Sequence, residues 1–330
     1  MNSIEFETKL FGMRRDFYGH RRINLSDGFR PVGGMLGDFC VIEHGGRYHF
    51  FAIERRLQEG TPFYPGHEVF FCHASIADLL NWDVHEPVMW VRPDSWENGH
   101  VWAPYIIRWK NRFLMAYTGL NHLCSQDIGF AFSDDLFRWE RSPDNPLSPA
   151  KDCSWAFWRT DGIASCRDPH LFIENGRLFM TYTANTSAGA SCIALTSTDD
   201  SNHWKCHGPI LTGRTDGYEA RLEGNHPQGQ LESSNLFRRN DRWYLLTHEV
   251  RHDSPIKNWI YKSDRMDSFD YSSGRDFWSG AYTVEFVKER GTKSLLATSG
   301  TIRFGEVDWS VANPEVRFIN DEEQLRAWFL

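Results

Sequence analysis

The sequence predicts an all-β fold, a five-bladed β-propeller with a short C-terminal helix. Three observations predict it: a repeated segment, two strand-like stretches around a turn in each copy, and an aromatic residue that closes each copy. Aromatic residues make up 15% of the 330 residues, and 14 of these residues are Trp, enough large side chains to pack blades against one another. Because propellers of this length fold as one unit, residues 1–330 are expected to form a single domain.

The first half of the repeat reads as a β-hairpin. Its four visible copies begin 64, 66 and 64 residues apart, at Asp38, Trp102, Asp168 and Glu232. From its opening residue, each copy runs through an apolar stretch and a turn of Gly, Asn, Asp or Lys into a second, aromatic-rich strand. Spacing this regular predicts that the four copies are equivalent structural units.

The second half of each copy adds two further strands. One ends in Ser and Asp turn residues, and the other surrounds an aromatic residue: Trp82, Trp139, Trp204 or Phe269. From opening residue to aromatic, the last three copies span 37, 36 and 37 residues, and the first spans 44 because it has an insertion. Four strands per copy are what one propeller blade requires.

The remaining sequence accounts for a fifth blade and for the chain ends. Residues 277–318 have enough strand pattern for a fifth blade, and ring closure is expected to use both ends of the chain. Residues 1–30 are assigned to an N-terminal extension that takes part in that closure. Residues 321–328 place an acidic turn before apolar positions, which predicts a short helix within about residues 320–330.

Composition and charge limit the function classes. The net charge of −8 and the pI near 6.0 argue against a nucleic-acid partner, which would need clustered Lys and Arg. Neither a secretory leader nor a run of about 18 apolar residues is present, so a cytoplasmic protein without a membrane partner is expected. Seven Cys without C-x-x-C spacing are expected to be reduced core thiols, and no metal or cofactor site is predicted.

The repeat also predicts a site. In a propeller the innermost strands begin near the central axis, so residues that open equivalent strands converge there. Three of the four openers are carboxylates: Asp38, Asp168 and Glu232. Cleavage of a glycosidic bond needs one neutral acid to protonate the leaving oxygen and one ionised group to attack or to activate water. The sequence therefore predicts a carboxylate triad that cleaves a small carbohydrate substrate.

Two motifs at these positions resemble a known family. Residues 166–172 (CRDPHLF) are similar to the Arg-Asp-Pro motif of glycoside hydrolase family 32, and residues 231–237 (LESSNLF) resemble its Glu-Cys motif, with Ser233 in place of Cys. Residues 73–82 are similar to the family's blade-one strand, and residues 102–104 (WAP) are more similar to family 43. From about residue 37 to residue 269, the chain resembles the five-bladed furanosidases of families 32, 68 and 43.

The resemblance implies a role for each carboxylate. It implies that Glu232 is the acid, that Asp168 holds sugar hydroxyls and stabilises the positively charged transition state, and that Asp38 is the nucleophile or general base. Family 32 surrounds its nucleophile with Asn and Pro, whereas residues 35–40 read MLGDFC here and keep only the Asp. The sequence also stops short of the C-terminal β-sandwich usual in that family, so it resembles a minimal propeller.

Residues near the three carboxylates are predicted to bind the substrate. Arg167 either contacts a sugar hydroxyl or forms an ion pair that fixes the strand. Trp102 opens a central strand and is expected to stack on a sugar face. The other predicted substrate-binding residues are Phe39, Trp155, Trp158, His226 and Gln228.

Four functions remain open at this point. The leading hypothesis is an exo-acting, β-fructofuranosidase-like glycoside hydrolase, and a family 43-like α-L-arabinofuranosidase or β-xylosidase is the first alternative. A glycoside phosphorylase would need a basic phosphate pocket beside the acid. A non-catalytic sugar-binding propeller would keep the aromatics but would not need three carboxylates. Phosphate dependence separates hydrolase from phosphorylase, and any turnover excludes the binding module. The sequence leaves sugar, stereochemistry and oligomeric state open.

Overall fold

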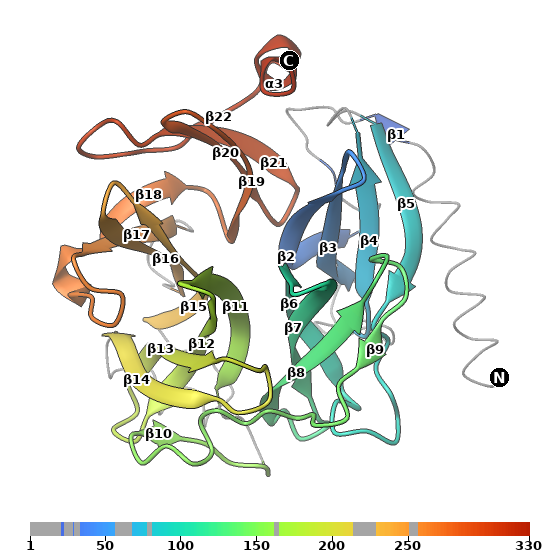
Figure 1. The fold of residues 1–330 in the computed structure, drawn as a ribbon, viewed down its shortest axis with the longest axis vertical. Coiled ribbons are helices and arrows are strands. Elements are labelled where there is room, and N and C mark those ends of the chain that lie inside the picture. The colour runs from blue at the N-terminus through green and yellow to red at the C-terminus, as the bar shows by residue number, and fades with distance from the viewer. Residues whose placement is uncertain are drawn as a thin grey trace.

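The described part of the chain is a five-bladed β-propeller (Figure 1). The computed structural model describes residues 21–22, 29, 34–56, 68–77, 81–161, 165–213, 229–250 and 257–330. These residues form five antiparallel sheets around a central axis, and the C-terminal helix lies beyond the fifth sheet. The predicted fold class is confirmed.

Each blade is built from strands that follow one another along the chain. Blade one consists of β1 (Arg21–Arg22), β2 (Gly34–His44), β3 (Arg47–Arg56), β4 (Phe71–Ile76) and β5 (Asn81–Val88). Blade two consists of β6 (His100–Trp109), β7 (Arg112–Leu120), β8 (Gln126–Ser133) and β9 (Glu140–Arg141). Blade three consists of β10 (Ala156–Phe157), β11 (Cys166–Glu174), β12 (Arg177–Thr186), β13 (Ser191–Thr198) and β14 (Lys205–Thr212).

The last two blades follow the same order. Blade four consists of β15 (Gln230–Arg239), β16 (Arg242–Val250), β17 (Lys257–Ser263), the 3-10 turn η1 (Tyr271–Ser273) and β18 (Arg275–Ser279). Blade five consists of β19 (Val284–Arg290), β20 (Lys293–Thr298), β21 (Arg303–Asp308) and β22 (Arg317–Phe318). The fifth blade therefore begins later than residue 277, because Phe277 lies in β18, which pairs with β17 in blade four.

The hairpins between the first two strands have the turn chemistry that the sequence predicts. Gly45 and Gly46 join β2 to β3 with φ of 61° and 72°, and Asn175 and Gly176 join β11 to β12 with φ of 51° and 77°. Two successive residues with positive φ form the turn whose twist matches that of antiparallel strands. These turns fix which residues of neighbouring strands face each other.

Side-chain packing closes the ring between the first and last blades. Trp82 is fully buried and stacks on Phe29 with ring centroids 4.3 Å apart. The same apolar cluster contains Phe304 of blade five and Leu325 and Trp328 near the C-terminus. Backbone bridges also join residue 29 to 302 and residue 36 to 300. Segments from both ends of the described chain therefore hold the ring together.

The C-terminal helix α3 (Glu322–Ala327) is shorter than the predicted segment. Asp321 caps it, because its carboxylate accepts a hydrogen bond of 2.7 Å from the backbone N–H of Glu323. Leu325 is buried against the cluster between blades one and five. The helix therefore acts as a packing element. No helix among the described residues has the length and apolar character that a membrane crossing requires.

The stability of the ring is expected to depend strongly on Trp82. Trp82→Ala should lower the free energy of unfolding by about 3–5 kcal/mol, because it removes a buried indole and leaves a cavity in the cluster. Urea unfolding followed by circular dichroism measures this loss. Val311→Ala, at a side chain that is 51% exposed, is the matched control and should change the value by less than about 0.5 kcal/mol. Equal effects of the two substitutions would contradict this role for Trp82.

The cysteines are only partly as predicted. All seven are free thiols, but Cys124 and Cys206 are exposed and Cys153 is half-buried, so three of them lie outside the core. The sulfurs of Cys153 and Cys206 lie 2.8 Å apart, although 53 residues separate them in the sequence. Cys124 and Cys153 lie in loops, and Cys206 lies on β14, the strand at the outer edge of blade three.

Candidate active site

A β-bulge interrupts the innermost strand of each of the first four blades. Strand pairing skips residues 37–38 in β2, 103–104 in β6, 168–169 in β11 and 233–234 in β15. Ala103, Asp168 and Ser233 occupy the first skipped position and have φ of 45°, 54° and 51°. Such conformations cost non-glycine residues about 1–3 kcal/mol and tend to occur at functional sites. Bulges also redirect side chains, which places this feature at the predicted site.

The strand pairing corrects the predicted register. Trp102, Arg167 and Glu232 are each the last paired residue before the bulge. Asp168 is the first residue of its bulge, and Asp38 is the second residue of its own. The residues predicted to open the four repeats therefore each lie in or next to the bulge of their own strand, but they do not occupy equivalent positions. Spacing in the sequence located the bulge but not each residue's place in it.

The structure brings the three carboxylates together around Ser233. The Ser233 hydroxyl donates a hydrogen bond of 2.7 Å to Oδ1 of Asp38, and its backbone N–H donates one of 3.3 Å to Oδ2 of Asp168. Glu232 is the preceding residue of the chain. Asp38 and Asp168 are 9% and 5% exposed, so both carboxylates are almost removed from solvent. Ser233, which stands where the motif it resembles has Cys, thus links blades one and three to blade four.

Arg167 fixes two of these carboxylates. Its guanidinium lies 2.7 Å from Oε1 of Glu232 and 3.4 Å from Oδ2 of Asp168. The same side chain donates hydrogen bonds to Ser165 at 2.8 Å and to Gln126 at 3.3 Å. Of the two roles predicted for Arg167, the structure shows the ion pair. Because buried charges need partners, these contacts hold the guanidinium and the carboxylates in one arrangement.

A second group of contacts surrounds the cluster and has no motif in the sequence. Arg55 of β3 pairs with Glu68 at 2.7 Å, and Glu68 accepts a hydrogen bond of 2.6 Å from the indole of Trp102. The Tyr282 hydroxyl donates to Oε2 of Glu232 at 3.4 Å. Arg55 lies over the Tyr282 ring, 5.9 Å from its centroid. Sequence reasoning missed Arg55, Glu68 and Tyr282, because they come from three separate segments and belong to no repeated motif.

Blade five contributes a further acid that the sequence did not single out. Burial raises the pKa of Glu285 in β19 well above its usual value, and the charge of Asp38 raises it further. The charge of Glu285 adds to the raised pKa of Tyr105 in β6 and of the Cys40 thiol in β2, for both of which burial is the main cause. The acidic character of the axis therefore extends beyond the predicted triad.

Burial and mutual repulsion control the protonation of the cluster. Burial raises the pKa of Asp168 to about 7, although Arg167 opposes this; Asp38 and Glu232 add to the increase. Burial also raises the pKa of Asp38, while Ser233 and Arg55 act in the opposite direction. The cluster therefore retains a proton near neutral pH. A neutral acid beside an ionised carboxylate is the combination that glycosidic cleavage needs.

The raised pKa of Asp168 predicts a pH-dependent stability. A carboxyl whose pKa is higher in the folded state binds more protons there, so its stabilising contribution is complete at low pH and is lost as the pH rises through the folded value. The pKa of Asp168 in the folded state is about 7. Between about pH 5 and pH 8, the free energy of unfolding of wild type should therefore fall by about 2–3 kcal/mol relative to that of Asp168→Asn.

Urea unfolding of both proteins across that range measures the difference. Comparing the two proteins cancels the contributions of titrating groups that do not interact with Asp168. Asp127→Asn is the matched control, because burial raises the pKa of Asp127 as well, but only to about 6. The stability difference between wild type and Asp127→Asn should therefore disappear at a lower pH than the difference between wild type and Asp168→Asn. A difference between wild type and Asp168→Asn that does not change with pH would contradict the raised pKa of Asp168.

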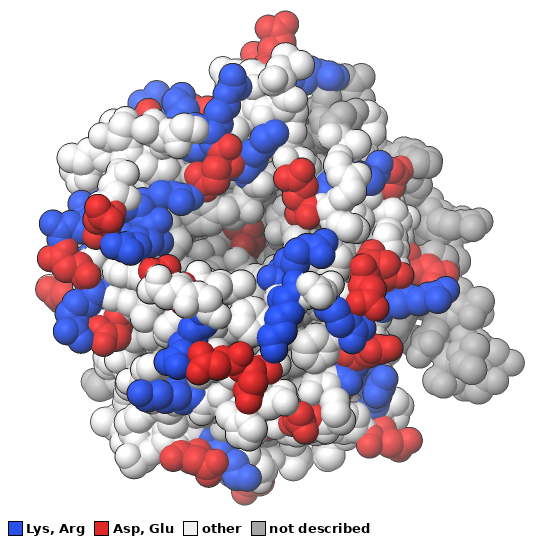
Figure 2. Space-filling model, in the orientation of Figure 1, with Lys and Arg blue, Asp and Glu red and all other residues white. Residues whose placement is uncertain are grey.

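The other predicted residues lie in several places. Phe39 is 2% exposed and packs on Phe50, so the structure places it in the blade-one core rather than at an open surface. Trp155 and Trp158 are half-buried against the cluster between blades two and three. Trp102 is half-buried, with its indole N–H held by Glu68. His226 and Gln228 lie outside the described residues. Figure 2 shows a depression at the centre of the ring with acidic atoms in its depth.

A five-bladed propeller with three carboxylates at the bulges of its inner strands defines a class of protein, the glycoside hydrolase propellers. The family model for the glycosyl hydrolases family 32 N-terminal domain matches residues 38–238, which is more than half of the chain. The chain therefore belongs to this family. The matched range begins at Asp38 and also contains Asp168 and Glu232.

Individual relatives are distant. The sucrose-6-phosphate hydrolase of Klebsiella pneumoniae is 25% identical over 191 residues, which cover 54% of this chain and 36% of that protein. The match thus spans about a third of that relative's length. The Bombyx mori family 32 β-fructofuranosidase is similar in structure, with a TM-score of 0.68 at 14% identity, covering 96% of this chain and 68% of that one.

A family 43 structure is similar to nearly the same degree. The α-L-arabinofuranosidase of Clostridium thermocellum has a TM-score of 0.59 at 16% identity, over 86% of this chain and 93% of that one. At such low identities, structural similarity establishes the fold alone. The resemblance to family 32 seen in the sequence is confirmed at the level of the family, and the resemblance to family 43 at the level of the fold.

Proposed function

We propose that this chain is a glycoside hydrolase that removes a terminal sugar from a small oligosaccharide or glycoside, with β-fructofuranosidase-like specificity. The observation that carries the proposal is the cluster of Asp38, Asp168 and Glu232 around Ser233. Family membership and the distant similarity to sucrose-6-phosphate hydrolase support it. So does the structure of a Bombyx mori β-fructofuranosidase variant in complex with sucrose, which has a TM-score of 0.67.

In this proposal each carboxylate has the role that the family resemblance implies. Glu232, with a side chain 16% exposed, is the most accessible of the three and protonates the leaving-group oxygen as the glycosidic bond breaks. Asp38 attacks the anomeric carbon or takes a proton from an attacking water, and Ser233 orients its carboxylate. Asp168, in its ionised form, accepts hydrogen bonds from sugar hydroxyls and stabilises positive charge at the anomeric carbon.

The contacts of the nearby cations favour hydrolysis over phosphorolysis. Phosphate binding requires cationic groups that can turn toward an anion. Among the described residues beside the cluster, Arg167 is bound to Glu232 and Asp168, and Arg55 is bound to Glu68. Both guanidinium groups are therefore engaged with carboxylates. Water is the acceptor that this arrangement supports best.

A substrate screen tests the proposal. Purified protein should release sugar from sucrose, sucrose 6-phosphate or a chromogenic fructoside, and phosphate should not accelerate the release. Arabinosides, xylosides and galactosides in the same screen test the family 43-like alternative. NMR of the first-formed anomer distinguishes retention from inversion. Absence of turnover on every substrate by folded protein would contradict an enzymatic role, and strict phosphate dependence would indicate a phosphorylase.

A further inference from the structure

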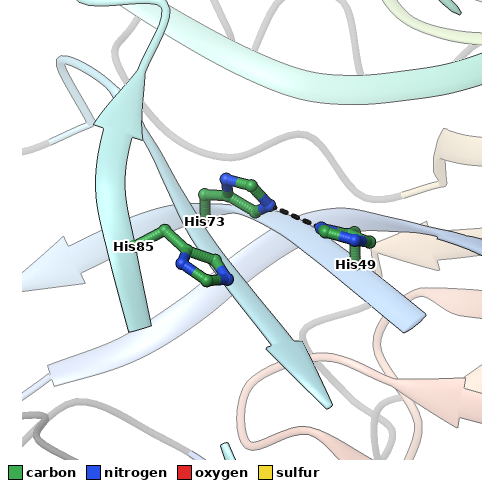
Figure 3. Close-up of side chains that lie close together, drawn as sticks. All are labelled: His49, His73 and His85. Carbon is green, nitrogen blue, oxygen red and sulfur yellow. Dashed lines mark hydrogen bonds between the residues drawn. The ribbon is translucent and has the colours of Figure 1, made fainter. Parts of the chain in front are cut away.

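Three histidines meet on one face of blade one, away from the carboxylate cluster. His49, His73 and His85 lie on the adjacent strands β3, β4 and β5, and one ring nitrogen of each lies within 4.8 Å of the others (Figure 3). His73 pairs directly with His85 across the sheet. Ile53 of β3 lies opposite the β2 bulge that contains Asp38. His49 is four residues from Ile53 along β3, which places the two backbone positions about 13 Å apart in an extended strand. The two groups of side chains are therefore separate sites.

The cluster is buried and incompletely hydrogen-bonded. His73 and His49 are 0% and 3% exposed. Nδ1 of His49 lies 2.9 Å from Nε2 of His73, and Nε2 of His85 lies 2.7 Å from the Ser75 hydroxyl. Nδ1 of His73 is buried and has no hydrogen-bond partner. The ring nitrogen of His73 that faces His49 is Nε2, so Nε2, and not the unpaired Nδ1, is the atom placed to bind an ion shared with His49.

The surroundings keep these rings neutral and shield them from water. Phe51 stacks on His73 at 4.2 Å between ring centroids, and Phe137 of blade two lies 4.9 Å from the same ring. Burial lowers the pKa of His49 to about 4 and the pKa of His73 well below its usual value. The charged groups facing the cluster are Arg47 and Asp83, which pair with each other, and His44 lies beside His49. Neutral imidazole is the form that coordinates a metal.

The geometry points to a divalent transition-metal site formed by His49, His73 and His85, with Zn²⁺ as the ion that these ligands suit best. Three imidazoles without a carboxylate or carbonyl ligand do not suit Ca²⁺ or Mg²⁺, which require oxygen ligands. Imidazole nitrogens bind Zn²⁺ at about 2.0–2.1 Å, so ligand atoms within 4.8 Å of one another need only a small closure. The Ser75 hydroxyl contacts Nε2 of His85, so it would be an outer partner if Nδ1 of His85 binds the ion, and the ion would displace it if Nε2 does.

Such an ion would join three neighbouring strands of blade one. Because the ligands are 24 and 12 residues apart, the ion would fix contacts that are distant in sequence. An ion that binds only the folded state raises thermal stability through mass action. At a free Zn²⁺ concentration about a hundredfold above Kd, the expected increase in Tm is about 4 °C for a chain of this size.

Metal binding by the full chain tests the proposal. Protein freed of metal with a chelator is titrated with ZnCl₂, and bound zinc is counted by mass spectrometry after desalting. Wild type should bind one Zn²⁺ per chain, and His85→Asn should weaken that binding at least about tenfold, because it removes one of three ligands. His203→Asn is the matched control, because His203 is exposed, pairs with Asp200 and lies outside the cluster. It should bind zinc as wild type does.

A second readout keeps the test independent of folding defects. His85 is only partly buried, so His85→Asn should retain the wild-type near-ultraviolet circular dichroism spectrum. Co²⁺ added to wild type should give the visible absorption of a four-coordinate site, and His85→Asn should lack it. Absence of stoichiometric zinc in wild type, or equal binding by His85→Asn, would overturn the proposal. Removing the metal should leave glycosidase activity unchanged, so the two proposals fail separately.

Discussion

Glu232→Gln is expected to lower kcat by about 10²- to 10⁴-fold on a substrate with a poor leaving group, while the propeller stays folded. Glutamine keeps the size of the side chain but cannot deliver a proton to the departing oxygen. Steady-state kinetics on sucrose or a simple alkyl fructoside measures the loss. The effect should be much smaller on a nitrophenyl fructoside, because that leaving group departs without protonation.

Two comparisons separate the loss of an acid from general damage. Asp241→Asn removes a carboxyl from the same blade at a side chain that is 96% exposed, and it should leave kcat unchanged. Glu232→Gln also breaks the contact with Arg167, so near-ultraviolet circular dichroism must match that of wild type. Full activity of Glu232→Gln on the poor leaving group would refute the assignment of Glu232 as the acid.

Asp38→Asn is expected to lower kcat by about 10³-fold or more, because it removes the carboxylate that attacks the anomeric carbon or activates water. The neutral amide fits the same space and still accepts a hydrogen bond from Ser233. If the enzyme is retaining, azide added to Asp38→Gly should restore turnover and yield a glycosyl azide of inverted configuration. Mass spectrometry and NMR of the product measure this result.

Ser233→Ala provides a graded companion to that experiment. It removes the 2.7 Å hydrogen bond to Asp38, and a hydrogen bond to a charged group is worth about 1.5–3 kcal/mol, so a loss of about 10- to 100-fold is expected. Because Ser233 lowers the pKa of Asp38, the acidic limb of kcat/KM should move to higher pH in the variant. Near wild-type activity in Asp38→Asn, or an unmoved acidic limb in Ser233→Ala, would contradict the role of Asp38.

The sequence by itself determined the number of blades and the position of the site. Period-two alternation, Gly and Asn turns, and a closing aromatic are local features, and they specify strands and hairpins without reference to distant residues. Their recurrence located Asp38, Asp168 and Glu232 at one end of three inner strands. Motif resemblance then gave the family, which the comparison with known proteins confirmed.

Only the tertiary structure decided the details of the site. The register at the bulges depends on pairing between strands, which the sequence does not show. In the structure, Trp102, Arg167 and Glu232 are equivalent positions just before a bulge, whereas Asp168 and Asp38 lie within one.

Contacts between blades gathered Arg55, Glu68, Tyr282 and Glu285 near the carboxylates, and pairing within blade one joined His49, His73 and His85. These residues come from several separate segments of the sequence and share no motif. Hydrophobic packing of the sheets, a non-local interaction, determines which of them meet. The carboxylates and Arg167 were therefore predictable one by one, whereas the other partners that set the charge and orientation of the carboxylates were not.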